Sequence, residues 1–290
     1  MSKVDEVLKE LTDRIISKLK EAKKDNNTPI FDSPWDGDPM PINFTTGAYY
    51  NGINIFNLWL AAEKNEFPSN QWCTPNQLFS YAKSNKLEIN FKGQKTTPII
   101  KWVEGYKPAN SDPDTPGITF PRVFNVLNKS QIEGIPVEET KEILITREAV
   151  NKWVHDIGAE IKHGGDRAFF SPHDDHIGMP KIHRFKSEDH YWNVLFHELT
   201  HWTGHKTRLD RQQVAGGTKE TYAYEELIAE MGAALTSALM NVPSKVNHAG
   251  YIDGYISLLK NDYNILKTAA SKAGQAYQYL QSPENRRIVA

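Results

Sequence analysis

The feature that most constrains this chain is the pentapeptide His-Glu-Leu-Thr-His at residues 197–201. If this segment is helical, His197 and His201 project from the same face about one turn apart, where two imidazole nitrogens can meet one zinc ion. Glu198 lies beside them and could take a proton from a water that the metal activates and pass it to a leaving amine. The pattern therefore predicts a metal site of the zinc-peptidase type. Two plainer interpretations are a surface helix that carries these residues by chance and a purely structural metal site.

Signals at both ends indicate a helix over 188–203. Ser187 is a suitable N-cap, because its hydroxyl can accept a hydrogen bond from a free backbone N–H of the first turn. Glu188 and Asp189 suit the positive end of the helix dipole, and Gly204 suits the exit of the chain. The histidine pair thus lies in the last turns of a helix with apolar flanks.

A catalytic zinc needs a third protein ligand and an open position for water. His205 continues the four-residue spacing, but on a straight helix it would lie about 12 Å along the axis from His197. A helix expected over 221–240 is the better source. Glu226 and Glu230 share one of its faces. We favour Glu226 as the ligand, with Glu230 as the alternative ligand or as the partner that orients a ligand histidine through its second ring nitrogen.

Other residues at the start of that helix have weaker claims. Glu225 is expected to point elsewhere. Tyr222 and Tyr224 could place a hydroxyl near a developing oxyanion, although most tyrosines in such positions only pack. The plain alternative for the acids is a solvated helix face. The expected cofactor is Zn²⁺, with another divalent metal as the alternative.

Composition places the chain among ordinary globular proteins without a strong electrostatic preference. The formal net charge is −2, so binding to nucleic acid requires a local patch. The single cysteine, Cys73, cannot form an internal disulfide or a thiolate zinc cluster, which favours a cytoplasmic location. Segment 1–22 lacks the unbroken apolar core of a signal peptide, and no stretch is long and apolar enough to span a bilayer. We therefore expect no membrane partner.

A chain of 290 residues exceeds the usual size of one domain. We expect an α+β protein with an α+β domain at 1–142 and a mostly helical domain at 143–290. The first is predicted to contain helices over 1–24, 52–63 and 75–85, a hairpin over 86–103 with Gly93 as its turn, a loop over 108–117, a strand over 120–127 and a linker over 134–140. The second is predicted to contain helices over 147–161, 188–203, 221–240 and 248–280 and short strands around 168–170 and 176–179.

Several longer motifs together resemble one family. The most specific are His-Glu-Leu-Thr-His-Trp-Thr-Gly-His at 197–205, Arg-Leu-Asp-Arg at 208–211 and Tyr-Ala-Tyr-Glu-Glu-Leu-Ile-Ala-Glu at 222–230. The first half adds Pro-Ile-Asn at 41–43, Tyr-Asn-Gly-Ile-Asn at 50–54 and Trp-Cys-Thr-Pro-Asn-Gln at 72–77. Over nearly its whole length the chain resembles the ArdC-like antirestriction proteins of bacterial plasmids, phages and other mobile elements. The resemblance implies an N-terminal domain that binds single-stranded DNA, joined to a zincin domain similar to SprT-type proteases.

The lysine-rich segment 83–107 is the candidate for contact with DNA. It holds six lysines against Glu88 and Glu104, interleaved with Phe91, Trp102 and Tyr106. A basic groove with aromatic platforms can hold a single strand, because phosphates need cations and exposed bases need stacking partners. Lysines on a hairpin edge often only block edge-to-edge pairing, and the aromatics can be core residues. Residues 92–95 read Lys-Gly-Gln-Lys where the family usually has a Lys-Gly-Glu-Lys-like turn, so both lysines are kept. Together with the resemblance, the segment predicts DNA contacts at Lys92, Lys95, Lys101 and Trp102.

Three functions are compatible with these observations. The favoured one is an antirestriction protein of a mobile element that binds single-stranded DNA and carries a zinc metallopeptidase-type site, directed at a protein substrate or a component of the restriction system. The second is a DNA-shielding protein whose zincin domain is not proteolytic. The third is a metal-dependent regulatory protease without a DNA role, which predicts no oligonucleotide binding by residues 1–142. Replacing Glu198 by Gln keeps the metal ligands and removes the base, so it separates the first two.

Overall fold

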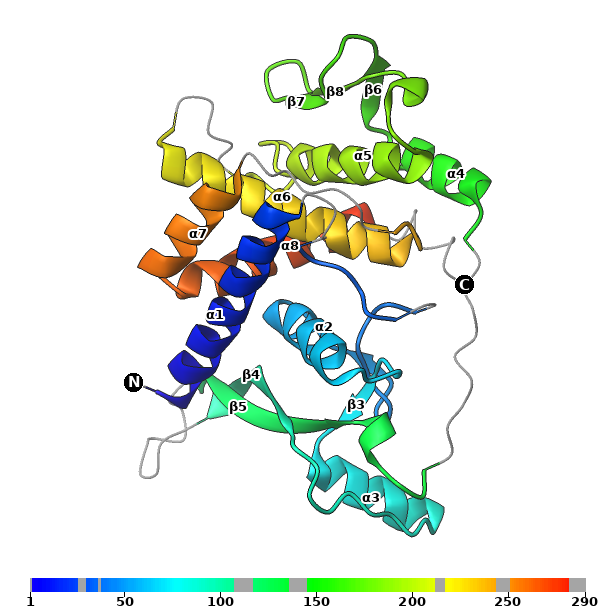
Figure 1. Ribbon diagram of the computed structural model, residues 1–290, viewed down its shortest axis with the longest axis vertical. Helices are drawn as coiled ribbons and strands as arrows, with labels where there is room; N and C mark the ends of the chain where they lie inside the picture. The colour runs from blue at the N-terminus through cyan, green and yellow to red at the C-terminus, as the bar shows by residue number, and fades with distance from the viewer. Residues whose placement is uncertain are drawn as a thin grey trace. The chain divides into compact units, whose positions relative to one another are not determined.

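The computed structural model describes residues 2–25, 30–35, 38–106, 117–135, 145–211, 217–243 and 251–281. They form two compact units, the first made of Met1–Leu11 and Pro41–Glu139 and the second of Thr12–Met40 and Thr140–Ala290. Each unit contains helices and strands (Figure 1), which confirms the predicted α+β fold with two domains. The expected boundary at residue 142 lies outside the described residues, as do all but Gly134 and Ile135 of the linker over 134–140 and all but Gly117 of the loop over 108–117.

The first unit is built on a five-stranded sheet. Its strand order is β2-β1-β3-β5-β4, with β1 and β3 parallel and the other pairs antiparallel. The strands are β1 (Ile42–Asn43), β2 (Ala48–Tyr49), β3 (Gln71–Cys73), β4 (Thr97–Tyr106) and β5 (Ile118–Asn128).

The hairpin predicted within 86–103 is wrong. β4 pairs with β5, in a register that places Thr97 opposite Val126. Gly93 does make a turn, at φ +83°, but the residues before it form only an isolated bridge between Asn90 and Glu133. The alternation of apolar residues indicated the strand β4. It did not indicate the partner of β4, because that partner, β5, lies farther along the sequence.

Two helices complete the first unit. α2 (Ile53–Asn65) covers the free edge of β4, where the Asn54 amide donates to the Ile100 carbonyl at 2.7 Å and accepts from the Ile100 N–H at 2.9 Å. Asn57 donates to the carbonyl of Pro98 at 2.6 Å. α3 (Pro75–Asn85) has the predicted bounds, because Thr74 and Gln77 form a capping box at its start. The edge strand is thus protected by side chains instead of by a further strand.

The N-terminal helix α1 (Lys3–Lys24) is amphipathic as predicted. Leu8, Leu11, Ile15 and Leu19 are buried. The division between the two units falls inside this helix, and residues 12–40 group with the second half of the chain. Lys23, near the end of the helix, forms an ion pair with Asp253 of that second half at 2.7 Å. The apolar stripe of a helix shows that it packs, but not against which core.

In its described residues, the second unit combines the later part of α1 with a small sheet and the helices α4 to α8. The sheet contains β6 (Glu160–His163), β8 (His176–Met179) and β7 (Phe169–Ser171), in that order, with β6 parallel and β7 antiparallel to β8. The helices are α4 (Arg147–Ile157), α5 (Glu188–Thr203), α6 (Lys219–Leu239), α7 (Ile252–Asn261) and α8 (Asn264–Leu280). Two helix predictions ran too far. Gly158, in the left-handed conformation, ends α4, and the helix expected over 248–280 is divided at Asp262.

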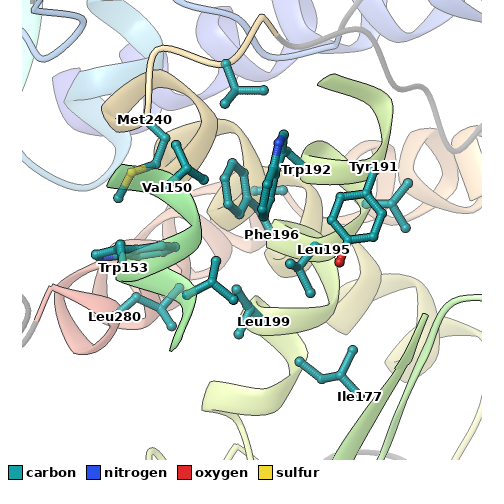
Figure 2. Close-up of a cluster of buried hydrophobic side chains, with 14 of the residues drawn as sticks. Val150, Trp153, Ile177, Tyr191, Trp192, Leu195, Phe196, Leu199, Met240 and Leu280 are labelled. Atoms are coloured by element: carbon teal, nitrogen blue, oxygen red, sulfur yellow. The ribbon is translucent and has the colours of Figure 1, made fainter. Parts of the chain in front are cut away.

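An aromatic core holds α5 in place between its neighbours. Figure 2 shows Trp153 of α4 beside Trp192 and Phe196 of α5, together with Leu195, Leu199 and Met240. The ring of Phe196 meets Trp153 edge-on at 5.9 Å and stacks on Trp192 at 6.2 Å. Such pairs add to the free energy gained from burial. The helix that carries the pentapeptide is therefore a rigid element of the core.

None of the helices in the described part of the chain combines the length and apolar character of a membrane span.

Candidate metal centre

Helix α5 has the predicted bounds and the predicted cap. The Ser187 hydroxyl accepts a hydrogen bond from the N–H of His190 at 3.1 Å, which satisfies one of the free donors at the helix start. His197 and Glu198 are only 4% and 7% exposed. Because buried polar side chains need partners, their surroundings decide what they can do.

The two histidines face one another and a carboxylate from α6. His197 Nε2 lies 3.1 Å from His201 Nε2, and the rings are 4.8 Å apart at 78°. The Glu226 carboxylate oxygens lie 3.5 Å from each of these nitrogens. One possible ligand atom from each residue falls within 4.8 Å of the other two. Three donors from two helices therefore converge on one small volume.

This arrangement of atoms favours a cation. If His201 donates its Nδ1 proton to the Glu225 carboxylate behind it, its Nε2 lone pair points at the Nε2 of His197 and at the Glu226 carboxylate. Burial alone would lower the pKa of the His201 imidazole, but its contacts with Glu225 and Glu226 outweigh burial and raise that pKa to about 10. Burial would likewise raise the pKa of Glu226, yet His197 and His201 hold it far below its usual range. The cluster thus attracts positive charge, and its donor set of two imidazoles and a carboxylate fits a divalent metal.

Glu225 does not point elsewhere, and that prediction is wrong. Its carboxylate lies 3.3 Å from Nδ1 of His201. Glu230 lies 3.8 Å from Nδ1 of His197, on the side away from Glu226. Helix α6 thus places one acid in front of the two rings and one behind each. A count of acids could have suggested this, because a histidine that binds metal usually donates its other N–H to a carboxylate or carbonyl.

A glycine sets how closely α6 approaches α5. The two helices lie side by side in Figure 1. A Cβ added at Gly232 would lie 2.5 Å from Cγ2 and 2.7 Å from Oγ1 of Thr200. Only a residue without a side chain fits there, so Glu226 and Glu230, on the same helix, come within reach of the histidines.

The cluster opens into a pocket of about 540 Å³. Glu198 lies at this pocket, as do Tyr222 and Tyr251, whose hydroxyls are 3.0 Å apart. Tyr224 lies elsewhere, with the Lys272 ammonium 5.2 Å from its ring centroid. The rest of the wall is formed by one charged and several apolar residues next to and within β7 and α5, namely Arg167, Ala168, Phe169, Phe170, Pro172 and Val194.

His205 is not part of the cluster. Its Nδ1 lies 2.8 Å from the Thr207 hydroxyl, and its ring meets that of Phe170 edge-on. Nearby, Arg208 pairs with Asp175 in the turn between β7 and β8, and its guanidinium lies 3.9 Å from the centre of the Trp202 ring. The loop after α5 is therefore fastened to the sheet that carries part of the pocket wall.

The four residues expected to contact DNA are exposed, but they do not all project from one face of the sheet. Lys92 and Lys95 flank the turn at Gly93. Lys101 and Trp102, which is 51% exposed, are neighbours on β4, so their side chains leave on opposite faces of the sheet. Lys101 lies opposite Arg122 of β5, a second cation, which stands outside the lysine-rich segment 83–107.

Comparisons with known proteins cover both units. Residues 5–143 match a family model described as the N-terminal domain of anti-restriction factor ArdC. Residues 148–272 match one described as a zincin-like metallopeptidase. Among curated proteins, a DNA primase TraC from Escherichia coli is 34% identical over 98% of this chain, and the chain spans only 28% of its length. The protein y4eC from Sinorhizobium fredii is 28% identical, with 97% of this chain and 93% of that protein covered.

Two solved structures match along the entire length. The metal-free crystal structure of the antirestriction protein ArdC from plasmid R388 is 31% identical with a TM-score of 0.79, and covers 96% of this chain and 98% of that one. Its Mn(II)-bound structure is 32% identical with a TM-score of 0.77, and covers 97% and 98%. Given both family models and this agreement over both units, the chain belongs to the ArdC family of antirestriction proteins.

Proposed function

We propose that this protein protects incoming DNA of a mobile element from host restriction by binding single-stranded DNA and acting as a metal-dependent peptidase in the cytoplasm. One observation carries the catalytic part of the proposal. His197, His201 and Glu226 converge within 4.8 Å, and Glu198 lies at the same pocket. Glu230 is the alternative third ligand, although its carboxylate lies 3.8 Å from Nδ1 of His197, on the far side of that ring.

The donor set supports zinc as the metal, since two imidazoles and one carboxylate are a common catalytic zinc set that leaves a position open. Manganese also accepts nitrogen and oxygen ligands, and the relative from R388 was crystallised both with Mn(II) and without metal. The match to both structures indicates that the metal is not what holds such a fold together. When bound, a divalent metal would polarise a peptide carbonyl and lower the pKa of water.

The residues around the cluster have roles that suit peptide hydrolysis. Glu198 is the general base that takes a proton from water and returns it to the leaving amine. The Tyr222 hydroxyl, held by Tyr251, faces the pocket and can donate to a developing oxyanion. β7 is an edge strand whose residues help to form the pocket wall, so it can pair with an extended peptide.

The DNA part of the proposal rests on the first unit. Lys92, Lys95, Lys101 and Trp102 are exposed and combine cations with an aromatic ring, as single-strand binding requires. The relatives support a role in DNA transfer, because one is a plasmid antirestriction protein and another is named a DNA primase. The same proposal includes a target for the pocket, which is a protein substrate or a component of the restriction system.

A DNA shield without proteolysis is the second candidate. It is favoured by the match of 98% of this chain to part of a protein named as a primase, where a DNA-handling module would be useful beside another activity. In that case Glu198 would be dispensable, whereas the cations of the first unit would not.

Replacing Glu198 by Gln tests the proposal, because the amide keeps the shape of the side chain and cannot act as a base. Protection should be measured as the transfer of a plasmid into a restricting host, with Glu220→Gln, an exposed acid on α6, as control. We expect Glu198→Gln to bind metal and oligonucleotide as the wild type does and to lose protection, since a general base contributes roughly 10²–10⁴-fold to rate. Full protection by this variant would favour the shield.

A further inference from the structure

We infer that Arg211 and Glu225 are positioning residues that fix the orientation and tautomer of His201, so that metal retention depends on a buried pair outside the three ligands. The inference rests on the proposed metal site. It concerns the series of contacts from His201 to Glu225 and from Glu225 to Arg211, on the side of the His201 ring that faces away from Glu226.

Arg211 is buried, and its guanidinium connects its own loop to the end of α5 and to α6. It is 6% exposed. Its Nη2 donates to the carbonyl of Thr200 at 2.5 Å and its Nη1 to the hydroxyl of Thr203 at 2.8 Å, both at the end of α5. Its Nη2 and Nε also reach the two carboxylate oxygens of Glu225 on α6, at 3.0 and 3.3 Å. A planar fork of donors suits this task, which a lysine cannot reproduce.

Glu225 receives both the arginine and the histidine. Its Oε1 lies 3.3 Å from Nδ1 of His201 and 3.0 Å from Nη2 of Arg211. The guanidinium of Arg211 contacts both carboxylate oxygens of this acid and supplies the opposite charge. An ionised carboxylate accepts the Nδ1 proton of the imidazole, which leaves the Nε2 lone pair toward Glu226.

The charge of Arg211 explains why this acid can stay buried. A carboxylate at this depth without a cation would be costly. The pair Arg211–Glu225 is neutral as a unit, so it holds the ring of His201 from behind without adding net charge to the site. Loss of either member would leave the other as an unpaired buried charge and release the ring.

Two isosteric or near-isosteric substitutions in the full chain test the inference, Glu225→Gln and Arg211→Lys. Each has a matched control. Glu220→Gln makes the same change at an exposed site of α6, and Arg208→Lys makes the same change at an arginine that contacts Asp175 and Trp202 instead. Zinc and Mn(II) affinities should be measured by competition with a chromophoric chelator.

We expect both test variants to bind metal about 10–100-fold more weakly, as found when outer partners of metal-binding histidines are removed. The two controls should stay close to the wild type. The double variant should lose little more than the weaker single variant, because both changes break one unit. In the zinc-loaded wild type, ¹H–¹⁵N NMR of the imidazole should place the His201 proton on Nδ1, and Glu225→Gln should weaken that signature.

The outcomes separate this inference from the proposed function. If the wild type binds neither metal, both fail. If the wild type binds metal and His201→Ala does not, but Glu225→Gln and Arg211→Lys match their controls, the site stands and the positioning role is overturned. Should Arg211→Lys be too unstable to purify, Glu225→Gln decides alone, with its metal-free unfolding temperature measured to exclude a general loss of stability.

Discussion

The edge of β4 and the contact between α5 and α6 both bury polar groups, but they satisfy them in different ways. At the β4 edge, Asn54 offers a donor and an acceptor to the acceptor and donor of Ile100, and the set is complete. Between α5 and α6, the Nε2 atoms of His197 and His201 meet each other and the Glu226 carboxylate, and a cation would complete this set. A complete set serves the fold, whereas an incomplete one indicates a ligand.

The largest effect is expected where the complete set is broken. Asn54→Leu keeps the side chain's size and leaves the N–H and C=O of Ile100 without partners. Each unpaired buried group costs about 1–3 kcal/mol, so the free energy of unfolding should fall by roughly 2–6 kcal/mol. Urea unfolding measures this. Asn65→Leu is the control, because the exposed Asn65 amide donates to the carbonyl of Ala61 in its own helix. An equal loss in both variants would contradict the role of the edge.

The incomplete set should be sensitive to helix spacing. Gly232→Ala places a methyl group against Thr200, and overpacking of this kind costs about 1–3 kcal/mol. Because α6 must move away, metal affinity should fall as well. Gly274→Ala on α8 meets nothing within 4 Å and should be neutral or stabilising. Thermal unfolding with and without zinc provides both readouts. If Gly232→Ala kept full metal affinity, the spacing would not control the cluster.

The exposed residues of the first unit should affect binding without affecting stability. Trp102→Ala should weaken oligonucleotide binding by about 1 kcal/mol, roughly five-fold, if one base stacks on the ring. Lys101→Ala should reduce the slope of log affinity against log salt by about 0.7. Lys152→Ala, an exposed lysine of the second unit, is the control. Fluorescence anisotropy at several salt concentrations tests both, and a slope that does not change would remove Lys101 from the contact set.

The smallest effect concerns an ion pair whose acid is partly exposed. Arg208 holds the pKa of the Asp175 carboxyl below its usual value. The stabilisation from this pair is therefore present above the unfolded pKa of about 3.9 and is lost as pH falls through the lower folded pKa. The Asp175 side chain is 39% exposed, so the contribution should stay below about 1 kcal/mol. Asp175→Asn tolerates the positive φ of this position and should flatten the stability curve in that acid range. An unchanged curve would show that the pair contributes nothing.

Local signals predicted the parts of the fold that depend on neighbours in sequence. The cap at Ser187 and the box at Thr74 mark their helices well, because both act within one turn. The partner of β4 could not be found in this way, since a glycine turn at Gly93 looks the same whether or not strands flank it. The place of residues 12–40 depends on contacts far along the chain.

The same distinction holds for the site. Spacing alone brings His197 and His201 together and offers Glu226, which the structure places beside them. Glu225 was misjudged because the buried face of α6 is wider than a single row of residues four apart, and Tyr222, Glu225 and Glu226 all line the pocket. Arg211 follows the end of α5 in an irregular loop, where periodicity says nothing about direction.

The close approach at Gly232 also limits how this protein can vary over evolutionary time. A larger residue at that position can be accommodated only if position 200 becomes smaller at the same time. Homologues that carry alanine at 232 should therefore tend to carry alanine at 200, and a history in which one change precedes the other would pass through a weakened intermediate. The two positions form a linked pair whose joint substitution records the distance between the helices.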